Sequence, residues 1–179
     1  MTRHIGGRVH RSRYADFYTI LMTIDTQTLD PKRDPMGAAI LDYLTTGRAK
    51  TLTVMSSMFD DDEMPVDYLF RTTDSMPPLE LKALEMTRGT TLDVGAGAGC
   101  HALALQQRGV SVKAIDVSPL SCEAMRRRGI ADVECINLFD PRLGGGFDTI
   151  LMLMNGTGIA GKMSGLGGLL RRVASLLAP

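Results

Sequence analysis

Several features that mark specialised protein classes are missing from this sequence. Tryptophan is absent, and there are only four tyrosines and five phenylalanines. No apolar run approaches the roughly 18 residues that a membrane-spanning helix needs, so we expect no membrane span. Lysine plus arginine and aspartate plus glutamate number 20 each, and a net charge of zero gives no electrostatic reason to expect a nucleic-acid partner.

Cysteine is scarce as well. The chain has three, Cys100, Cys122 and Cys135, and none belongs to a paired CxxC motif. This spacing predicts neither a zinc site nor a disulfide framework, and we expect no bound metal. Because unpaired cysteines suit a reducing compartment, we expect a cytoplasmic protein.

Residues 1–33 lack a steady hydrophobic period, and we predict a mobile N-terminal extension there. Basic residues followed by the apolar stretch 17–22 loosely imitate a signal peptide. Asp16 interrupts that order, however, and no small-residue cleavage site follows. The true start of the protein is therefore left open between Met1 and Met22.

Residues 34–89 are expected to form an N-terminal helical or lid segment. Its residues Tyr68, Phe70 and 76–84 could cover the substrate, but we favour ordinary core packing for them. Asp34 can cap a helix whose first residue is Pro35, and Gly47 suits the end of that helix. Further along, the sequence predicts a short strand over 51–55, a solvated acidic loop over 60–63 and a second helix over 79–88.

After residue 89 the pattern changes to a regular alternation of strands and helices. Strands are predicted over 90–94, 110–116, 132–138 and 147–154, and helices over 100–108, 119–128 and 165–177. Short connections between such elements are typical of a parallel sheet covered by helices on both faces. We therefore predict a doubly wound α/β core over residues 90–179.

The segment from Leu92 to His101 reads LDVGAGAGCH and lies between a predicted strand and a predicted helix. Its glycines allow a tight turn and the close approach of a ligand, beside the unpaired N–H groups of a helix end. A dinucleotide fingerprint, G-x-G-x-x-G counted from Gly95, would need a glycine in place of Cys100. Asp93 would also repel a pyrophosphate at this turn, whereas it would attract a cationic ligand such as a sulfonium.

Asp116 is the second feature of interest. It ends the next predicted strand, where a carboxylate can accept both hydroxyls of a ribose. Ser118 already supplies the cap of the helix that follows, so Asp116 is not needed in that role. Together, the glycine turn and Asp116 favour a cofactor that carries a ribose and a sulfonium.

These motifs resemble those of class I S-adenosylmethionine-dependent methyltransferases. The turn over 92–99 is similar to the first motif of that family, and 114–119 is similar to the second. The apolar strand over 147–154 resembles its fourth strand, and 169–179 the helix that leads to its fifth. The resemblance covers residues 88–179 and implies a Rossmann-like sheet, S-adenosylmethionine as cofactor and methyl transfer as the reaction.

The resemblance also implies which residues bind the cofactor. The glycines would pack under its methionine part, the acid after the second strand would hold its ribose, and the loop after the third strand would edge its adenine. The residues after the fourth strand would close the cofactor side of the substrate pocket. The full set is Asp93, Gly95, Ala96, Gly97, Gly99, Asp116, Val117, Asn137, Leu138, Met154 and Asn155.

The family sheet has seven strands ordered 3-2-1-4-5-7-6, whereas this sequence ends at Pro179, before the fifth. We therefore expect a truncated chain with a four-stranded half-sheet ordered 3-2-1-4 and with strands 5–7 absent. The strand over 147–154 would then be an apolar sheet edge, which favours aggregation. Because the cofactor site lies mainly in the retained half, cofactor binding could outlast catalysis.

The expected reaction is an in-line displacement of the sulfonium methyl group by a nitrogen, oxygen, sulfur or carbon atom of the acceptor. Such chemistry depends mainly on positioning, and we name no catalytic residue. His101 is a candidate base or pocket residue, although a histidine in a first helical turn is more often structural. Residues 155–158 lack the Asn/Asp-Pro-Pro-aromatic run of amino-methylating nucleic-acid enzymes, so we expect a small-molecule acceptor.

Two other functions stay open. The first is a non-catalytic module that binds S-adenosylmethionine or a protein partner. The second is an NAD(P)-binding oxidoreductase, which Asp93 and Cys100 disfavour. The sequence identifies neither the methyl acceptor nor the oligomeric state.

Overall fold

The fold is described from a computed structural model, in which residues 26–48, 50–55 and 60–179 are placed. The expectations for the apolar stretch 17–22 and for the start at Met1 or Met22 lie outside the described residues. The last part of the predicted extension, residues 26–33, runs past the end of the central sheet. There the backbone N–H of Leu29 donates to the carbonyl oxygen of Val117 at 2.8 Å.

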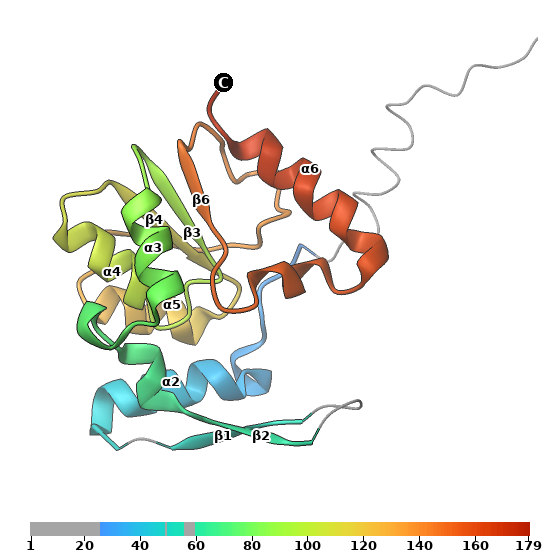
Figure 1. The fold of residues 1–179 in the computed structure, drawn as a ribbon. Coiled ribbons are helices and arrows are strands. Elements are labelled where there is room, and N and C mark those ends of the chain that lie inside the picture. Colours follow the sequence, from blue (N-terminus) through green and yellow to red (C-terminus); the bar gives the residue numbers. More distant parts are fainter. Residues whose placement is uncertain (1–25, 49, 56–59) are drawn as a thin grey trace, which may run out of the picture.

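The centre of the molecule is a four-stranded parallel sheet in the order β5-β4-β3-β6 (Figure 1). Its strands are β3 (Thr91–Val94), β4 (Val112–Asp116), β5 (Asp132–Cys135) and β6 (Thr149–Leu151). Numbered from the first strand of this sheet, the order is 3-2-1-4, as the sequence predicted. The strands β5 and β6 are shorter than predicted, because the chain turns away from the sheet soon after each of them to form loops.

Helices cover both faces of the sheet, as predicted (Figure 1). They are α3 (Pro78–Met86), α4 (Cys100–Gln107), α5 (Pro119–Arg127) and α6 (Leu166–Leu176). On one face, Ala114 of β4 is buried with Leu105 and Met125 from α4 and α5. On the other face, Leu92 of β3 is buried with Leu169 of α6. This alternation of side chains along the strands gives the protein two apolar layers.

Strand β6 forms one edge of the sheet, and the residues just before it already have a partner beyond that edge. Phe147 and Leu177 form an isolated parallel bridge after α6. The N–H of Ala178 donates to the carbonyl oxygen of Phe147 at 2.8 Å. In the described part of the chain this pairing stops at Phe147, so Thr149–Leu151 remain an edge with polar backbone groups available.

The N-terminal segment packs against the helices through α2 (Pro35–Thr46). As predicted, Asp34 caps α2 by accepting a hydrogen bond from the N–H of Gly37 at 2.8 Å, and Gly47 ends the helix with φ 68°. The second carboxylate oxygen of Asp34 accepts from the hydroxyl of Ser118 at 2.5 Å. Because Ser118 caps α5, the N-termini of the two helices are joined.

The prediction of an acidic loop over 60–63 is wrong for its second half. Asp62–Pro65 form β2, which pairs antiparallel with β1 (Thr51–Val54) in a separate two-stranded ribbon. Most of the ribbon is exposed, so its charged side chains point into water while the backbone groups pair. Pairing with a β-branched neighbour outweighs the low strand preference of aspartate and glutamate.

The remaining elements are short 3₁₀-helices of three to five residues. They are η1 (Pro31–Arg33), η2 (Val66–Phe70), η3 (Thr73–Ser75), η4 (Gly156–Ala160) and η5 (Met163–Gly165). Among the residues that are described, no helix is long and apolar enough to cross a membrane.

Candidate functional site

The backbone of the glycine turn between β3 and α4 is hydrogen-bonded to the end of the neighbouring strand β4. The N–H groups of Gly95 and Ala96 donate to the carbonyl oxygen of Ile115 at 2.9 and 3.1 Å. Gly97 has φ 57° and open space where a side chain would begin, so the turn presents bare backbone at this point. Gly99 differs, because a Cβ there would collide with Ile130, and its role is to let the turn pack closely against the protein interior.

The first cavity beside the turn has a volume of about 260 Å³ and lies at the carboxyl ends of β3, β4 and β5. We call it the Asp116 cavity. Ligands of open α/β sheets bind at this end of the strands. It is lined by Val94, Gly95, Ile115, Asp116, Val117, Ile136, Asn137, Leu138 and Ile159.

The carboxylate of Asp116 is held in a fixed orientation inside this cavity. One oxygen accepts from the N–H of Gly97 at 2.8 Å, and the other accepts from the N–H of Ser118 at 2.9 Å. Burial raises the pKa of Asp116, while these two backbone N–H groups act in the opposite direction. An ionised carboxylate has about four acceptor positions, so each oxygen can still accept a ligand hydroxyl.

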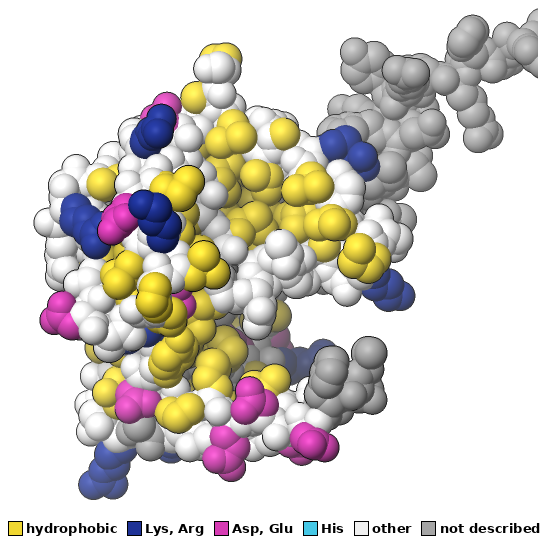
Figure 2. All heavy atoms as spheres, in the orientation of Figure 1, with side chains coloured by type: hydrophobic (Ala, Val, Ile, Leu, Met, Phe, Trp, Pro, Cys, Tyr) yellow, Lys and Arg dark blue, Asp and Glu magenta, His cyan; other side chains and the backbone are white. Residues whose placement is uncertain are grey.

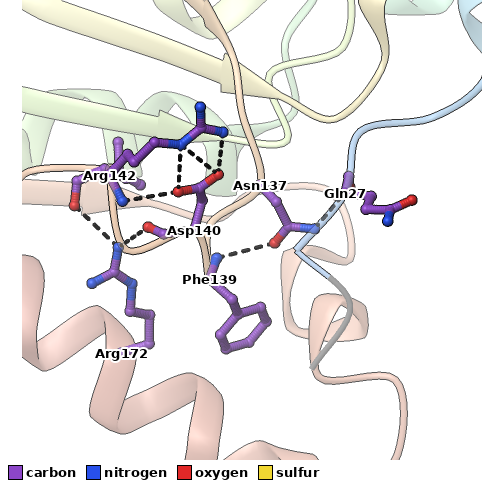
Figure 3. Close-up of polar contacts among 7 residues, drawn as sticks. Gln27, Asn137, Phe139, Asp140, Arg142 and Arg172 are labelled. Carbon is purple, nitrogen blue, oxygen red and sulfur yellow. Dashed lines mark hydrogen bonds and ion pairs between the residues drawn. The ribbon is translucent and has the colours of Figure 1, made fainter. Parts of the chain in front are cut away.

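The loop after β5 forms the far edge of the Asp116 cavity and is fixed by polar contacts (Figure 3). The side-chain oxygen of Asn137 accepts from the N–H of Phe139 at 3.0 Å, and its amide nitrogen donates to the carbonyl oxygen of Gln27 at 3.3 Å. Asn137 therefore joins this loop to the strap of residues 26–30.

A guanidinium from α6 braces the same loop from below (Figure 3). Arg172 donates to the carbonyl oxygens of Leu138 and Asp140 at 2.8 Å each, and to that of Leu143 at 3.1 Å. Arg142 pairs with the Asp140 carboxylate, which lowers the pKa of Asp140 to about 2. The loop is thus preorganised by contacts from outside the cavity.

The second cavity has a volume of about 350 Å³ and meets the first at Val94 and Gly95. We call it the Asp93 cavity. It lies between the glycine turn, the segment after β6 and the N-terminal segment. Figure 2 shows that the molecule is hollowed between the β1–β2 ribbon and the region of α6. Its lining is mostly apolar and consists of Met36, Val54, Met64, Leu69, Asp93, Val94, Gly95, Ala96, Gly97, Ala98, Cys100, His101, Leu153, Met154 and Asn155.

Asp93 lies on the floor of this cavity with an exposed fraction of 2%. Its Oδ2 atom has no hydrogen-bond partner among the described residues. Burial raises the pKa of Asp93 to about 6, and His101 and the N–H of Ala102 only partly oppose that rise. A buried carboxylate oxygen without a partner is costly, and a cationic or hydrogen-bond-donating ligand would relieve the cost.

His101 is bound to a buried ion pair from the N-terminal segment. Its Nε2 lies 2.8 Å from Oε2 of Glu80 on α3, and the same oxygen accepts from Arg71 at 2.5 Å. Burial lowers the pKa of His101, but Cys100, Glu80 and Asp93 together raise it to about 9. These neighbours favour the protonated imidazole, which is held at the edge of the Asp93 cavity.

The backbone after β6 is strained where it borders this cavity. Met154 and Asn155 have φ values of 52° and 64°, in the left-handed region that few side chains other than asparagine adopt readily. The sulfur of Met154 accepts a hydrogen bond from Arg71 at 3.0 Å. Strain of this kind persists where surrounding contacts hold it, and it is common at ligand sites.

All the cofactor residues predicted from the sequence, except Gly99, line one of the two cavities. Three apolar residues that line the Asp116 cavity were not predicted from the sequence, namely Ile115, Ile136 and Ile159. The first two could have been expected there, because they lie at the ends of predicted strands. A helical or lid segment was predicted over residues 34–89, but Met36, Val54, Met64 and Leu69 were not identified as cavity residues, because no motif in that segment indicates what each side chain packs against.

No family model matches the sequence, and no curated protein matches it. Among solved structures, an S-adenosylmethionine-dependent methyltransferase from Bacteroides fragilis in complex with S-adenosyl-L-homocysteine is 54% identical, with a TM-score of 0.82. The match covers 86% of this chain and 64% of that chain, so the chain spans less than two thirds of the relative.

A more distant likeness shows the fold alone. DhpI, solved in a complex with SAM and HEP, is 18% identical, with a TM-score of 0.52. That match covers 88% of this chain and 64% of DhpI. The Bacteroides fragilis methyltransferase and DhpI therefore both share the arrangement of sheet and helices described above, although their sequence identities to this chain differ widely.

Proposed function

Because the chain has the fold of the class I S-adenosylmethionine-dependent methyltransferases, we propose that it binds S-adenosylmethionine and transfers its methyl group to a small molecule. The observation that carries this proposal is the buried Oδ2 of Asp93, which has no partner among the described residues. It lies in the Asp93 cavity, which adjoins the Asp116 cavity. S-adenosylmethionine has an ammonium and a sulfonium at one end and a ribose at the other. The two acids match these two ends.

The proposed placement of the cofactor follows from the two adjoining cavities. Its adenosine would lie in the Asp116 cavity, where the Asp116 carboxylate can accept the ribose hydroxyls and the loop at Asn137 borders the adenine. Its amino-acid end would pass Gly95 into the Asp93 cavity. The open space at Gly97 lets that end lie against the backbone of the turn.

The rest of the Asp93 cavity would hold the methyl acceptor. When bound, S-adenosylmethionine supplies a sulfonium methyl group that an acceptor nucleophile displaces in line. The chain contributes position and exclusion of water: Met64 and Leu69 wall the cavity on one side, and Leu153 walls it on the other. Such walls suit a small, largely apolar acceptor.

The nicotinamide alternative fits the same geometry poorly. A pyrophosphate at the glycine turn would lie near Asp93, whose charge would oppose it. Cys100 also occupies the position where a dinucleotide turn needs glycine, and it lines the cavity. The non-catalytic alternative shares the cofactor site, so only turnover separates it from the methyltransferase.

Calorimetric titration with S-adenosylhomocysteine, with NADH as a parallel ligand, tests the proposal. We expect wild-type protein to bind the first and not the second. Asp116→Ala should weaken binding by about tenfold or more, because two hydroxyl-to-carboxylate hydrogen bonds are lost. Asp132→Ala is the matched control, since Asp132 begins the neighbouring strand and is exposed.

Each other outcome has a definite meaning. Binding of NADH alone would overturn the proposal in favour of an oxidoreductase. Equal loss of affinity in the Asp116 and Asp132 variants would remove Asp116 from the ribose site. Binding of S-adenosylhomocysteine without turnover of S-adenosylmethionine on any small-molecule acceptor would favour the binding module.

A further inference from the structure

The Asp93 cavity contains two groups of opposite charge. Asp93 comes from the end of β3, and His101 comes from the first turn of α4, so both are fixed to the rigid sheet and helix that the glycine turn joins. Both residues are buried, with exposed fractions of 2% and 5%. A negative and a positive group in one small cavity match a zwitterion better than a ligand of one sign.

Glu80 holds a proton on the Nε2 atom of His101. The carboxylate of Glu80 accepts from Nε and Nη2 of Arg71 at 3.2 and 2.5 Å, and a guanidinium is always charged. Burial raises the pKa of Glu80, but His101 and Arg71 outweigh it, and the net direction is down. Because an ionised carboxylate only accepts, the Nε2 atom of His101 must carry the proton that joins the two side chains.

Arg71 has anchors of its own, and these fix the guanidinium that pairs with Glu80. Its guanidinium donates to the carbonyl oxygen of Tyr68 at 2.7 Å and lies 4.2 Å from the centre of the Tyr68 ring. It also donates to the sulfur of Met154. One buried cation therefore ties η2, α3 and the strained segment after β6 to the carboxylate that orients His101.

We propose that Glu80 is a positioning residue that holds His101 as a cation opposite Asp93, so that this pair recognises the amino-acid end of the cofactor. The ammonium lies against Asp93, and the carboxylate lies against His101 at the first turn of α4, where the helix end also favours an anion. This inference rests on the proposed function, since it concerns one end of the same ligand.

The alternative is a purely structural ion pair that fastens α3 to α4. Both roles predict that loss of Glu80 harms the protein, so stability does not distinguish them. The distinguishing property is ligand selectivity. A positioning role affects only ligands that carry an amino-acid end, whereas a structural role affects every ligand of the site alike.

The experiment compares S-adenosylhomocysteine with 5′-methylthioadenosine, which keeps the adenosine and the sulfur but lacks the amino-acid end. Binding of both is measured by calorimetry for wild type, Glu80→Gln and His101→Gln. We expect each variant to lose about tenfold or more in affinity for S-adenosylhomocysteine, the effect of one charge-assisted hydrogen bond, with little change for 5′-methylthioadenosine.

Glu85→Gln is the matched control, because Glu85 lies on the same helix, is exposed and forms a surface ion pair with Lys82. It should bind both ligands as the wild type does. A second readout needs no ligand: the pKa of His101, followed by NMR of the imidazole, should fall in Glu80→Gln and stay unchanged in Glu85→Gln. Glu80→Asp, which keeps the charge, should restore part of that pKa.

The outcomes separate the two proposals. If the wild type binds S-adenosylhomocysteine and the Glu80 and His101 variants bind it equally well, the inference is overturned and the proposed function stands. Equal losses for both ligands would also overturn it, in favour of the structural ion pair. If the wild type binds neither ligand, the proposed function itself fails.

Discussion

At the scale of single residues, Asp93 lies in an environment that disfavours its negative charge. Its side chain is fully buried and one oxygen lacks a partner among the described residues, so the ionised form is unfavourable in the ligand-free protein. The folded-state pKa, about 6, lies above the ordinary value of 3.8. As the pH rises from about 4 to about 6, the unfolded chain loses this proton first, and the stability of the fold decreases.

We therefore expect Asp93→Asn to stabilise the ligand-free protein at pH 7, by roughly 1–3 kcal/mol, because the buried charge is removed. The gain should shrink at pH 4, where Asp93 is protonated in the folded state. Thermal unfolding at the two pH values measures both effects, with the exposed Asp132→Asn as control. The same variant should bind S-adenosylhomocysteine more weakly.

A stabilised Asp93→Asn protein that keeps its full affinity for S-adenosylhomocysteine would show that Asp93 has no part in ligand binding. A destabilised variant would mean that the carboxylate is needed as a cap for α4. The N–H of Ala102 in the first turn of α4 contacts this carboxylate, so a role of Asp93 in holding the start of α4 is one that this variant can test.

At the scale of elements, α6 acts on the Asp116 cavity through Arg172. Its three hydrogen bonds to backbone carbonyls hold the loop that carries Asn137 and Leu138. Figure 3 shows the Arg172 guanidinium against this loop. Lysine cannot reproduce the planar fork of a guanidinium. The loop therefore depends on a residue that contacts Leu138 but does not itself line the cavity.

We expect Arg172→Lys to lower the free energy of unfolding by roughly 1–3 kcal/mol, since carbonyl groups lose their donors. It should also weaken binding of S-adenosylhomocysteine, because the adenine edge loses its support. Chemical denaturation and calorimetry measure the two effects. The neighbouring Arg171 is exposed, so Arg171→Lys should change neither; a loss of the same size there would contradict the assignment.

The elements that sequence could predict are those set by local signals. The caps at Asp34 and Ser118, the left-handed Gly47 and the glycine turn all depend on residues within a few positions of one another. Strand β2 escaped prediction because its acidic residues are held by pairing with β1, not by their own preference.

The same distinction explains which site residues were found. Asp93 and Asp116 stand in recognisable motifs at strand ends, whereas Glu80 and Arg71 do not. Glu80 meets His101 across 21 positions, and Arg71 meets Met154 across 83. Contacts over such distances follow from the tertiary packing of α3, and no local pattern encodes them.

At the scale of the whole molecule, the candidate site is built where two parts of the chain meet. The sheet and α4 supply the charged floor of the Asp93 cavity, and α2, the ribbon and η2 supply its apolar wall. The hydrogen bond between Asp34 and Ser118 joins the two parts at the N-termini of α2 and α5. The division at residue 89 into a lid segment and a core remains a prediction, with the acceptor expected between the two.

One S-adenosylmethionine is proposed to span both cavities, and a crystal structure of the protein with S-adenosylhomocysteine would show whether it does. We expect the ribose hydroxyls within about 3.2 Å of the Asp116 carboxylate and the ammonium at the same range from Oδ2 of Asp93. Adenosine bound outside the Asp116 cavity, or an amino-acid end turned away from Asp93, would contradict the claim.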